Sequence, residues 1–359
     1  MQISVVRPRD LEERELAAWR AMQRSSPEFA NPFLSPEFTL VVGRVRPDAR
    51  VAVLQEGPDA VGFFAFERRQ FRVGRPIAAG ICDSQAVVHA PGLDWSARDL
   101  LKGCGLDVLE FDHLIGGQLS AVGGKLTPRR SAIIDVSGGY EAYLERWLAT
   151  SRKTIKSTRY KQRKLERDLA GIRFEFDIHD PAALRTLLRW KSQQYRRTGQ
   201  RDRFAIAWIE RVVSDLFETR FDGCAGTLSV LYAAERVIAA HFGLRSDSTL
   251  SCWFPAYDHD LARYSPGLIL HLGMAERATM EGIQHLDLGK GDEDYKQSLK
   301  TGEIFVGEGW VERPSATALA LRFRRTPRRV AIGFAARHPT VRSTVRAARR
   351  LRAAAKVRQ

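Results

Sequence analysis

The sequence contains little cysteine, and the four cysteines present form no metal-binding or redox pattern. Cys82, Cys104, Cys224 and Cys252 stand far apart, with no CxxC pair among them. We therefore expect buried free thiols in a reducing compartment. No apolar stretch approaches the roughly 18 residues that span a membrane, and the first residues, MQISVVRPRD, lack the basic-then-apolar order of a signal peptide. These absences predict a cytoplasmic protein without a transmembrane segment.

Acidic residues are missing from the end of the chain, and this explains most of its net charge. The 359 residues include 57 Lys and Arg against 42 Asp and Glu, a formal charge of +15. Residues 322–359 hold thirteen basic residues and no acidic one, and 151–167 hold eight basic residues and one acidic. The remainder carries about −5. A body that is basic throughout is excluded, and two basic segments on a nearly neutral body remain.

The two basic segments have several possible roles. Residues 151–167 can bind the phosphates of an RNA or an anionic glycan, or they form an ordinary solvated helix face. Residues 322–359 alternate arginine with Ala, Val and Leu, which is typical of a basic amphipathic helix on an anionic membrane surface, a nucleic acid or a partner protein. Partial disorder is the alternative, because large apolar residues are few. The membrane-binding role of this tail would place the protein peripherally at the inner face of the membrane.

The composition and length predict a globular protein of two domains. Hydrophobic residues make up 44% of the chain and aromatic residues 9%. The same order of hairpin, strand, helix and closing strand occurs twice, and the closing strands match: GLDVLEF at 105–111 and GIQHLDL at 282–288. Duplication of an α/β unit explains the match. Convergence on a common helix–glycine–strand pattern is the alternative.

The predicted fold class is α/β (α+β), with two similar units that each contain a mixed, mostly antiparallel sheet flanked by helices. We place the N-terminal unit at 1–138 and the C-terminal unit at 222–312. A helical connector at 139–221 contains the basic helix 151–170, and a basic helical tail occupies 313–359. The polar sequences that suggest chemistry lie in the C-terminal unit.

One helix start in the C-terminal unit has the composition of an anion-binding site. Ser265 can cap this helix, Pro266 suits its first position, and Gly267 lets a ligand approach the backbone. Free N–H groups and the positive end of the helix dipole at such a start favour a pyrophosphate or another anion. Arg263, just before it, can pair with the same charge. Plain helix capping is the alternative.

A dense polar loop, DLGKGDEDYK at 287–296, directly follows the last matched strand. Functional residues often lie on loops at strand ends, where a rigid sheet holds them. Asp292, Glu293 and Asp294 lack the alternate-position pattern of an EF-hand loop. We therefore predict a functional loop without a metal ion.

Five sequence stretches resemble the acetyltransferases of the CelD/BcsL type, which are associated with cellulose biosynthesis: NPFLSPEF, the basic helix, CWFPAYD, ARYSPG and HLDLGKGDEDYK. These enzymes belong to the GNAT superfamily and lie close to the Fem-type peptidyltransferases. The resemblance spans roughly residues 20–305 and implies two GNAT units, of which the C-terminal one is active. It places a set of residues beside the pyrophosphate of acetyl-CoA or another acyl-CoA: Arg263, Tyr264, Ser265, Pro266 and Gly267.

The chain departs from the usual GNAT pattern Arg/Gln-x-x-Gly-x-Gly/Ala, of which only Gly267 is present, preceded by proline as in the Fem-like branch. The donor therefore stays open between an acyl-CoA and an aminoacyl-tRNA. The resemblance also implies an acceptor from envelope or exopolysaccharide biosynthesis, which is a sugar, a lipid-linked precursor or an amine.

Acyl transfer from a thioester needs a base for the nucleophile, a donor for the oxyanion and a proton for the thiolate. His241, in a strand with apolar neighbours, and Asp287, on the matched strand, are the candidate bases. Tyr257 or Tyr264 can protonate the thiolate. The resemblance to Fem-type enzymes places Lys296 near the transferred group. Each residue also has a structural alternative: a satisfied core histidine, a hydrogen-bonding carboxylate, aromatic packing or a surface lysine.

Three functions follow from these observations. The first is an N- or O-acetyltransferase, or another acyltransferase, that uses acetyl-CoA or a similar thioester. The second is a Fem-type transferase that uses aminoacyl-tRNA. The third is a non-catalytic GNAT scaffold that binds nucleic acid or membrane through 151–167 and 322–359.

Overall fold

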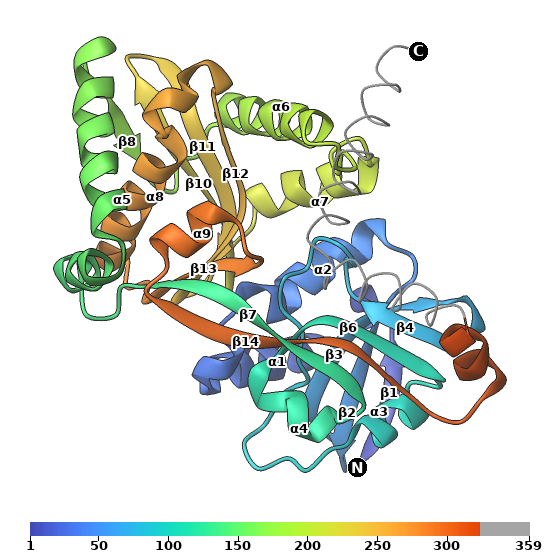
Figure 1. Cartoon of the computed structure of the whole chain (residues 1–359). Helices are drawn as coiled ribbons and strands as arrows, with labels where there is room; N and C mark the ends of the chain where they lie inside the picture. Colours follow the sequence, from blue (N-terminus) through green and yellow to red (C-terminus); the bar gives the residue numbers. More distant parts are fainter. Residues whose placement is uncertain (324–359) are drawn as a thin grey trace, which may run out of the picture.

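The computed structural model describes residues 1–323. Figure 1 shows two α/β halves that share one strongly twisted sheet, with helices on both of its faces. The first half contains the following elements: β1 (Gln2–Val6), α1 (Glu13–Ser25), α2 (Pro36–Val45), β2 (Ala49–Glu56), β3 (Asp59–Arg69), β4 (Val73–Pro76), β5 (Val88–His89), α3 (Ala97–Gly103), β6 (Val108–Ile115), α4 (Leu119–Val122) and β7 (Lys125–Asp135). Short 3-10 turns occupy Pro8–Asp10, Pro27–Phe29, Pro32–Leu34, Gln70–Arg72 and Gly116–Gln118.

The second half begins with a long helix and then repeats the order of the first. Its elements are α5 (Tyr140–Asp168), β8 (Arg173–Glu175), α6 (Pro181–Arg197), α7 (Ala207–Phe217), β9 (Arg220–Phe221), β10 (Cys224–Ala233), β11 (Arg236–Arg245), β12 (Thr249–Tyr257), α8 (Pro266–Met280), β13 (His285–Lys290), α9 (Asp294–Leu299) and β14 (Gly302–Glu312), with a 3-10 turn at His259–Tyr264. Both halves therefore contain a strand, two helices, an antiparallel run of strands, a helix, a strand, a short helix and a final strand.

The two halves exchange their final strands. The sheet has the order β1-β2-β3-β4-β6-β14-β7-β13-β12-β11-β10-β8, which is the same succession when followed inward from either end. β14 pairs with β6 of the first half, β7 pairs with β13 of the second, and β7 and β14 pair with each other. Each half thus completes its sheet with a strand from the other. The predicted α/β fold of two similar units with mixed sheets is confirmed.

The parallel strands β12 and β13 are neighbours only near their starts. They pair at 249–251 and 285–287, and no further pairing joins them in the described chain. β12 continues along β11 as far as Tyr257, whereas β13 returns to β7 at Lys290. The two strands therefore diverge beyond Ser251 and Asp287, and the sheet opens at that point.

Two apolar cores lie on the two faces of the second half. On one face α6 and α7 cover the sheet, and α2 of the first half packs against α7. Phe38 and Val42 of α2 share this core with Val213 of α7, so this core crosses between the halves. On the opposite face α5 and α8 cover the sheet around Leu270 and Met274. These packed faces hold the diverging strands in place.

Helix α5 contains a break at Ser151, whose backbone angles (φ −140°, ψ 42°) are not helical. The basic helix predicted at 151–170 is the second segment of α5 and ends at Asp168. Its Ile155 and Leu165 are buried, and its cations lie mainly on the outer side. The boundaries at 138, 221 and 312 stay predictions, and the basic tail beyond Phe323 lies outside the described residues. Among residues 1–323, no helix has both the length and the hydropathy to cross a membrane.

Candidate functional site

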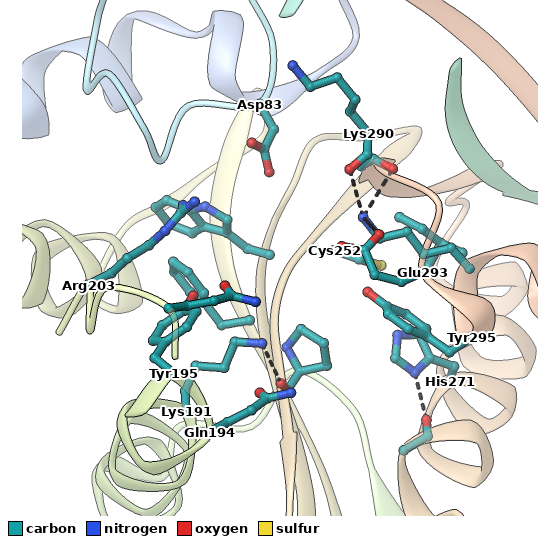
Figure 2. A pocket seen from close by; sticks show the side chains of 18 of the residues that line it. Asp83, Lys191, Gln194, Tyr195, Arg203, Cys252, His271, Lys290, Glu293 and Tyr295 are labelled. Atoms are coloured by element: carbon teal, nitrogen blue, oxygen red, sulfur yellow. Dashed lines mark hydrogen bonds and ion pairs between the residues drawn. The ribbon is translucent and has the colours of Figure 1, made fainter. Parts of the chain in front are cut away.

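A cavity of about 730 Å³ opens between the two halves, where β12 and β13 diverge. Helix α6 and the loop after it form one wall, and α8 and α9 form the opposite wall. Figure 2 shows these two walls facing each other, with Asp83 of the first half pointing into the space between them. Both halves of the chain therefore contribute to the site.

Lys296, one of the predicted site residues, fixes the end of β13 and the loop that follows it. Its Nζ donates hydrogen bonds to the carbonyls of Gly289 (3.3 Å) and Lys290 (2.9 Å) and lies 3.2 Å from a carboxylate oxygen of Glu293. Gly289 has a φ of +80°, a conformation that glycine adopts without strain. Lys296 lines the cavity and is buried, so the alternative of a solvated surface lysine is wrong.

The start of α8 lies at the cavity, as the anion-site prediction requires. Ser265 and Gly267 line the cavity together with Tyr257. Ser265 is in the left-handed region (φ 55°), and its hydroxyl does not cap the helix but receives a hydrogen bond from Nζ of Lys161 (2.9 Å). The prediction of side-chain capping is therefore wrong, because Ser265 has left-handed backbone angles and not the extended ones of a capping residue. Lys161 also adds a positive charge to the helix start.

Three other predicted residues at this helix start do not line the cavity. Pro266 is at the first helical position and is buried. The Arg263 guanidinium lies 4.7 Å from the centre of the Tyr264 ring and donates to the Tyr264 hydroxyl, which in turn donates to Asp168. Tyr264 is therefore buried against α5 and ties α8 to that helix. A role for Tyr264 in protonating the thiolate stays a prediction without a place in the cavity.

His271 lines the cavity one turn after Gly267, and its sequence context did not indicate a site residue. Its Nδ1 lies 2.7 Å from the Gly267 carbonyl, which can only accept, so Nδ1 carries the proton. Burial lowers the pKa of His271 below its usual 6.5, although the bond to Gly267 opposes this effect. The ring is therefore neutral at pH 7, and its Nε2 is buried without a hydrogen-bond partner among the described residues.

Two other side chains near His271 are held in their protonated forms. The rings of His271 and Tyr295 have centroids 5.8 Å apart. Burial raises the pKa of Tyr295 and that of the Cys252 thiol, and both residues line the cavity. Figure 2 shows Cys252, Tyr295 and His271 along one side of the cavity, opposite Lys191. A neutral base and a neutral hydroxyl thus lie side by side.

Asp287, a predicted base, is buried and is not among the residues that line the cavity. Its carboxylate accepts hydrogen bonds from the Ser131 hydroxyl (2.8 Å), the Gly289 N–H (2.9 Å) and the Asn31 amide (3.4 Å). Burial raises its pKa, and the hydrogen bonds from Gly289 and Ser131 oppose that rise. The carboxylate links β13 to β7 and to the first half, which favours the structural alternative.

His241, the other predicted base, is fully buried between β11 and α8 and is not among the cavity-lining residues. Burial, with a contribution from His271, lowers its pKa well below 6.5. Neither ring nitrogen has a hydrogen-bond partner among the described residues, so it is not the satisfied core histidine of the structural alternative. Its ring lies 6.0 Å from that of His271, centre to centre.

The α6 wall was also not evident from the sequence. Lys191, Gln194, Tyr195 and Thr198 line the cavity at the spacing of one helix face, and Arg203 follows in the next loop. Burial lowers the pKa of Lys191 to about 8, with a further contribution from the neighbouring Arg203 charge. The only sequence pattern that pointed to this wall was the helical periodicity of the polar residues in 191–198. It resembles the solvated face that most surface helices have.

The first half contributes a carboxylate-rich wall. The Asp83 carboxylate lies 3.7 Å from Nε2 of His113, and the other ring nitrogen lies 3.1 Å from Asp112. Burial raises the pKa of Asp83, and nearby Asp287 and Asp112 add to the rise while His113 opposes it. No group of three or more His, Cys, Asp or Glu in residues 1–323 is arranged to hold a metal ion.

Comparison with known families finds one match, and it covers most of the second-half residues that line this site. Residues 152–297 match the acetyltransferase (GNAT) domain family, a segment that runs from the basic part of α5 through α9. No curated protein matches the chain by sequence.

Solved structures share the fold over most of the chain. FemX aligns with a TM-score of 0.53 at 13% identity, over 85% of this chain and 97% of that one. The C-terminal domain of a putative lysylphosphatidylglycerol synthetase from Agrobacterium fabrum aligns with a TM-score of 0.51 at 13% identity, over 86% and 94%. A conserved protein of unknown function from Bacteroides thetaiotaomicron aligns with a TM-score of 0.53 at 10% identity, over 82% and 97%. At these identities the likeness shows the fold alone, and the CelD/BcsL type stays a prediction. Residues 152–297 are thus similar to acetyltransferase (GNAT) domains, and the chain shares its fold with FemX.

Proposed function

We propose that this protein is an acyltransferase that moves an acyl group from acetyl-CoA or a similar thioester to an amine or hydroxyl. The observation that carries the proposal is His271, a neutral histidine that lines the cavity one turn after the start of α8 and whose buried Nε2 has no hydrogen-bond partner among the described residues. A base and an anion-binding helix start are the parts that attack on a CoA thioester needs. The GNAT domain match supports the same chemistry.

The donor is proposed to bind along the start of α8. The backbone N–H groups there and the Lys161 ammonium, which already contacts the Ser265 hydroxyl, suit a pyrophosphate. Arg263 supplies a second cation beside this helix start. A side chain at Gly267 would begin 3.4 Å from the Tyr257 ring, so the glycine leaves that space to a ligand. Cys252 and His271 then lie farther along the cavity, toward the thioester.

The reaction is proposed to proceed by direct attack. His271 Nε2 takes the proton from the acceptor nitrogen or oxygen while a new bond forms to the acyl carbon. The carbon–sulfur bond then breaks, the thiolate takes a proton from the Tyr295 hydroxyl, and the proton that His271 took from the acceptor returns to Tyr295 beside it. Lys296 is proposed to act by holding the 289–293 loop, through its bonds to Gly289 and Lys290. Tyr257 is assigned to donor binding beside Gly267, rather than to proton transfer.

Acetyl-CoA is expected to raise the melting temperature of the full chain by several degrees at 100 times its dissociation constant, because ligand binding at that excess adds about 2.7 kcal/mol. Gly267→Trp should abolish the shift by filling the space beside Tyr257. Differential scanning fluorimetry measures both effects. Met280→Trp, at the exposed far end of the same helix, is the matched control and should keep the full shift. An equal shift in Gly267→Trp would contradict this donor site.

A second candidate, transfer from aminoacyl-tRNA, is favoured by the outer side of α5. Lys161 of the same helix contacts the start of α8. The part of α5 after the break at Ser151 carries seven exposed cations: Arg152, Lys153, Lys156, Arg159, Arg163, Lys164 and Arg167. Such a row suits the phosphates of an RNA. An anionic membrane surface is the other proposed partner of this row.

Under the second candidate, tRNA should bind with an affinity that falls steeply with salt. Lys153→Glu combined with Lys156→Glu should reduce the slope of log affinity against log salt by roughly one for each phosphate that the protein no longer neutralises. Filter binding at several salt concentrations measures the slope, and Arg98→Glu, an exposed cation on α3, is the control. Acetyl-CoA binding without any tRNA binding would remove this candidate. Absence of both, with binding to anionic vesicles, would favour a non-catalytic scaffold.

The acceptor is proposed to be a sugar, a lipid-linked precursor or an amine used in an envelope polysaccharide, which rests on the sequence resemblance alone. Mass spectrometry of small molecules retained during native purification tests this. An acylated sugar or amine would support the proposal, and recovery of neither acceptor class would count against it.

A further inference from the structure

The cavity cations divide into two kinds, according to whether a carboxylate neutralises them. Lys296 is paired with Glu293 at 3.2 Å, and Lys290 lies 3.6 Å from Glu308. Lys191 donates only to the carbonyl of Pro255 (3.1 Å), and Arg203 donates to the carbonyl of Gly80. In residues 1–323 neither Lys191 nor Arg203 has a carboxylate within ion-pair distance, although both line the cavity. Two positive charges thus lie on the same wall without an ion pair, and two carboxylates, Glu293 and Asp83, act on them only from a longer distance.

The rest of this wall consists of neutral hydrogen-bonding groups. Gln194, Tyr195, Thr198 and Gln200 line the cavity between the two cations, and no Asp or Glu of α6 or the following loop does so. The Gln194 side-chain oxygen is buried without a hydrogen-bond partner among the described residues, so this amide is free to turn its N–H groups toward a ligand. Burial raises the pKa of Tyr195, which keeps its hydroxyl as a donor.

The side of the cavity that the first half forms carries carboxylates. Asp83 points into the cavity from the first half, and Asp112 lines it nearby (Figure 2). An anionic ligand group is repelled from that side and attracted to the α6 wall. The burial that lowers the pKa of Lys191 makes an unpaired charge costly there, and an oxyanion beside it would offset that cost.

We propose that the α6 wall, through Lys191 and Arg203, binds a carboxylate or phosphate group of the acceptor. This inference rests on the proposed acyltransferase function, and it narrows the acceptor to an anionic molecule such as an acidic or phosphorylated sugar, or an amino acid. Arginine can grip either oxyanion with two parallel hydrogen bonds, and Lys191 adds a point charge from the side. The nucleophilic nitrogen or oxygen of the same molecule then faces His271 across the cavity.

The test uses the full chain, with inorganic phosphate and acetate as probes of the two oxyanions. We expect a saturable rise in melting temperature with at least one probe, relative to sodium chloride of equal ionic strength. Arg203→Gln and Lys191→Gln should each raise the dissociation constant at least about tenfold, because a hydrogen bond between charged groups is lost. Arg189→Gln removes an exposed cation from the same helix outside the cavity and should change nothing. Arg203→Lys keeps the positive charge and controls for a folding defect. It should bind the oxyanion probes more tightly than Arg203→Gln does.

One further variant, Lys161→Ala, separates this subsite from the donor site. Binding that is lost in Lys161→Ala but kept in Arg203→Gln would place the oxyanion at the α8 start and overturn the proposal, as would the absence of any saturable shift with both probes. The acetyl-CoA shift should persist in Arg203→Gln. If acetyl-CoA binds but neither oxyanion does, the acyltransferase proposal survives and this subsite fails. The probe with the lower dissociation constant identifies the acceptor group as phosphate or carboxylate.

Discussion

Replacing His271 by asparagine is expected to lower kcat/KM for acyl transfer by about 10²–10⁴-fold, the usual contribution of a positioned general base. The asparagine amide N–H can keep the bond to the Gly267 carbonyl, but it offers no basic nitrogen in place of Nε2. Release of CoA thiol from acetyl-CoA measures the rate, with a panel of anionic amines and sugars as acceptors. His259→Asn, which changes an exposed histidine before α8, is the matched control and should keep the wild-type rate.

The pH dependence gives this prediction a second readout. The base acts when neutral, and burial lowers the pKa of His271 below 6.5. Wild-type kcat/KM should therefore be level near pH 7 and decline as the pH falls through this lowered pKa. The residual activity of His271→Asn should lack that decline. Unchanged activity in His271→Asn, together with a large loss in Asp287→Asn, would instead assign the base to Asp287.

Phe38→Ala is expected to lower the free energy of unfolding by about 3–5 kcal/mol, the usual cost of removing a buried phenylalanine ring. Phe38 is fully buried on α2, meets Phe33 edge to face at 4.9 Å, and belongs to the core that crosses between the halves. The exchanged strands β7 and β14 also join the halves. We therefore expect the two halves to lose stability together. Urea denaturation measures the loss, and hydrogen exchange of peptides from each half shows whether it is shared.

Phe305→Ala supplies the comparison for this stability prediction. Its ring, on β14, is half exposed, so its removal should change the free energy of unfolding by no more than about 0.5 kcal/mol. A loss of protection in Phe38→Ala that is confined to the first half would show that the halves unfold independently. The shared core would then not couple them.

The sequence predicted those parts of the site that depend on neighbours along the chain. Ser265 and Gly267 lie at a helix start beside the cavity, and Lys296 lines it. Alternation along β13 puts Asp287 on the face opposite to that of Leu286 and Leu288, whose side chains belong to the core under α8. The sequence did not indicate that the Asp287 carboxylate accepts hydrogen bonds from Ser131 and Asn31, which lie far away in the sequence.

His271 was missed because its surroundings along α8 are apolar in nearly every direction. A histidine among leucines indicates burial, and only the divergence of β12 from β13 brings this one to a cavity. His241 shows the reverse error, because its strand position suggested a base and the packing of α8 sealed it from the cavity. The α6 wall needed the fold as well, since polar residues on one helix face normally meet water.

By itself, the sequence determined the segregation of charge, the repeated order of elements and the helix start at Ser265, because each follows from composition or from hydrogen bonds between near neighbours. Only the tertiary structure decided that the final strands are exchanged, that β12 and β13 separate, and that Lys191, Asp83 and His271 surround one cavity. Those outcomes depend on the register and packing of segments that are not neighbours in the sequence. The local pattern of apolar and polar residues specifies which face of an element is buried, but it does not specify which element covers that face.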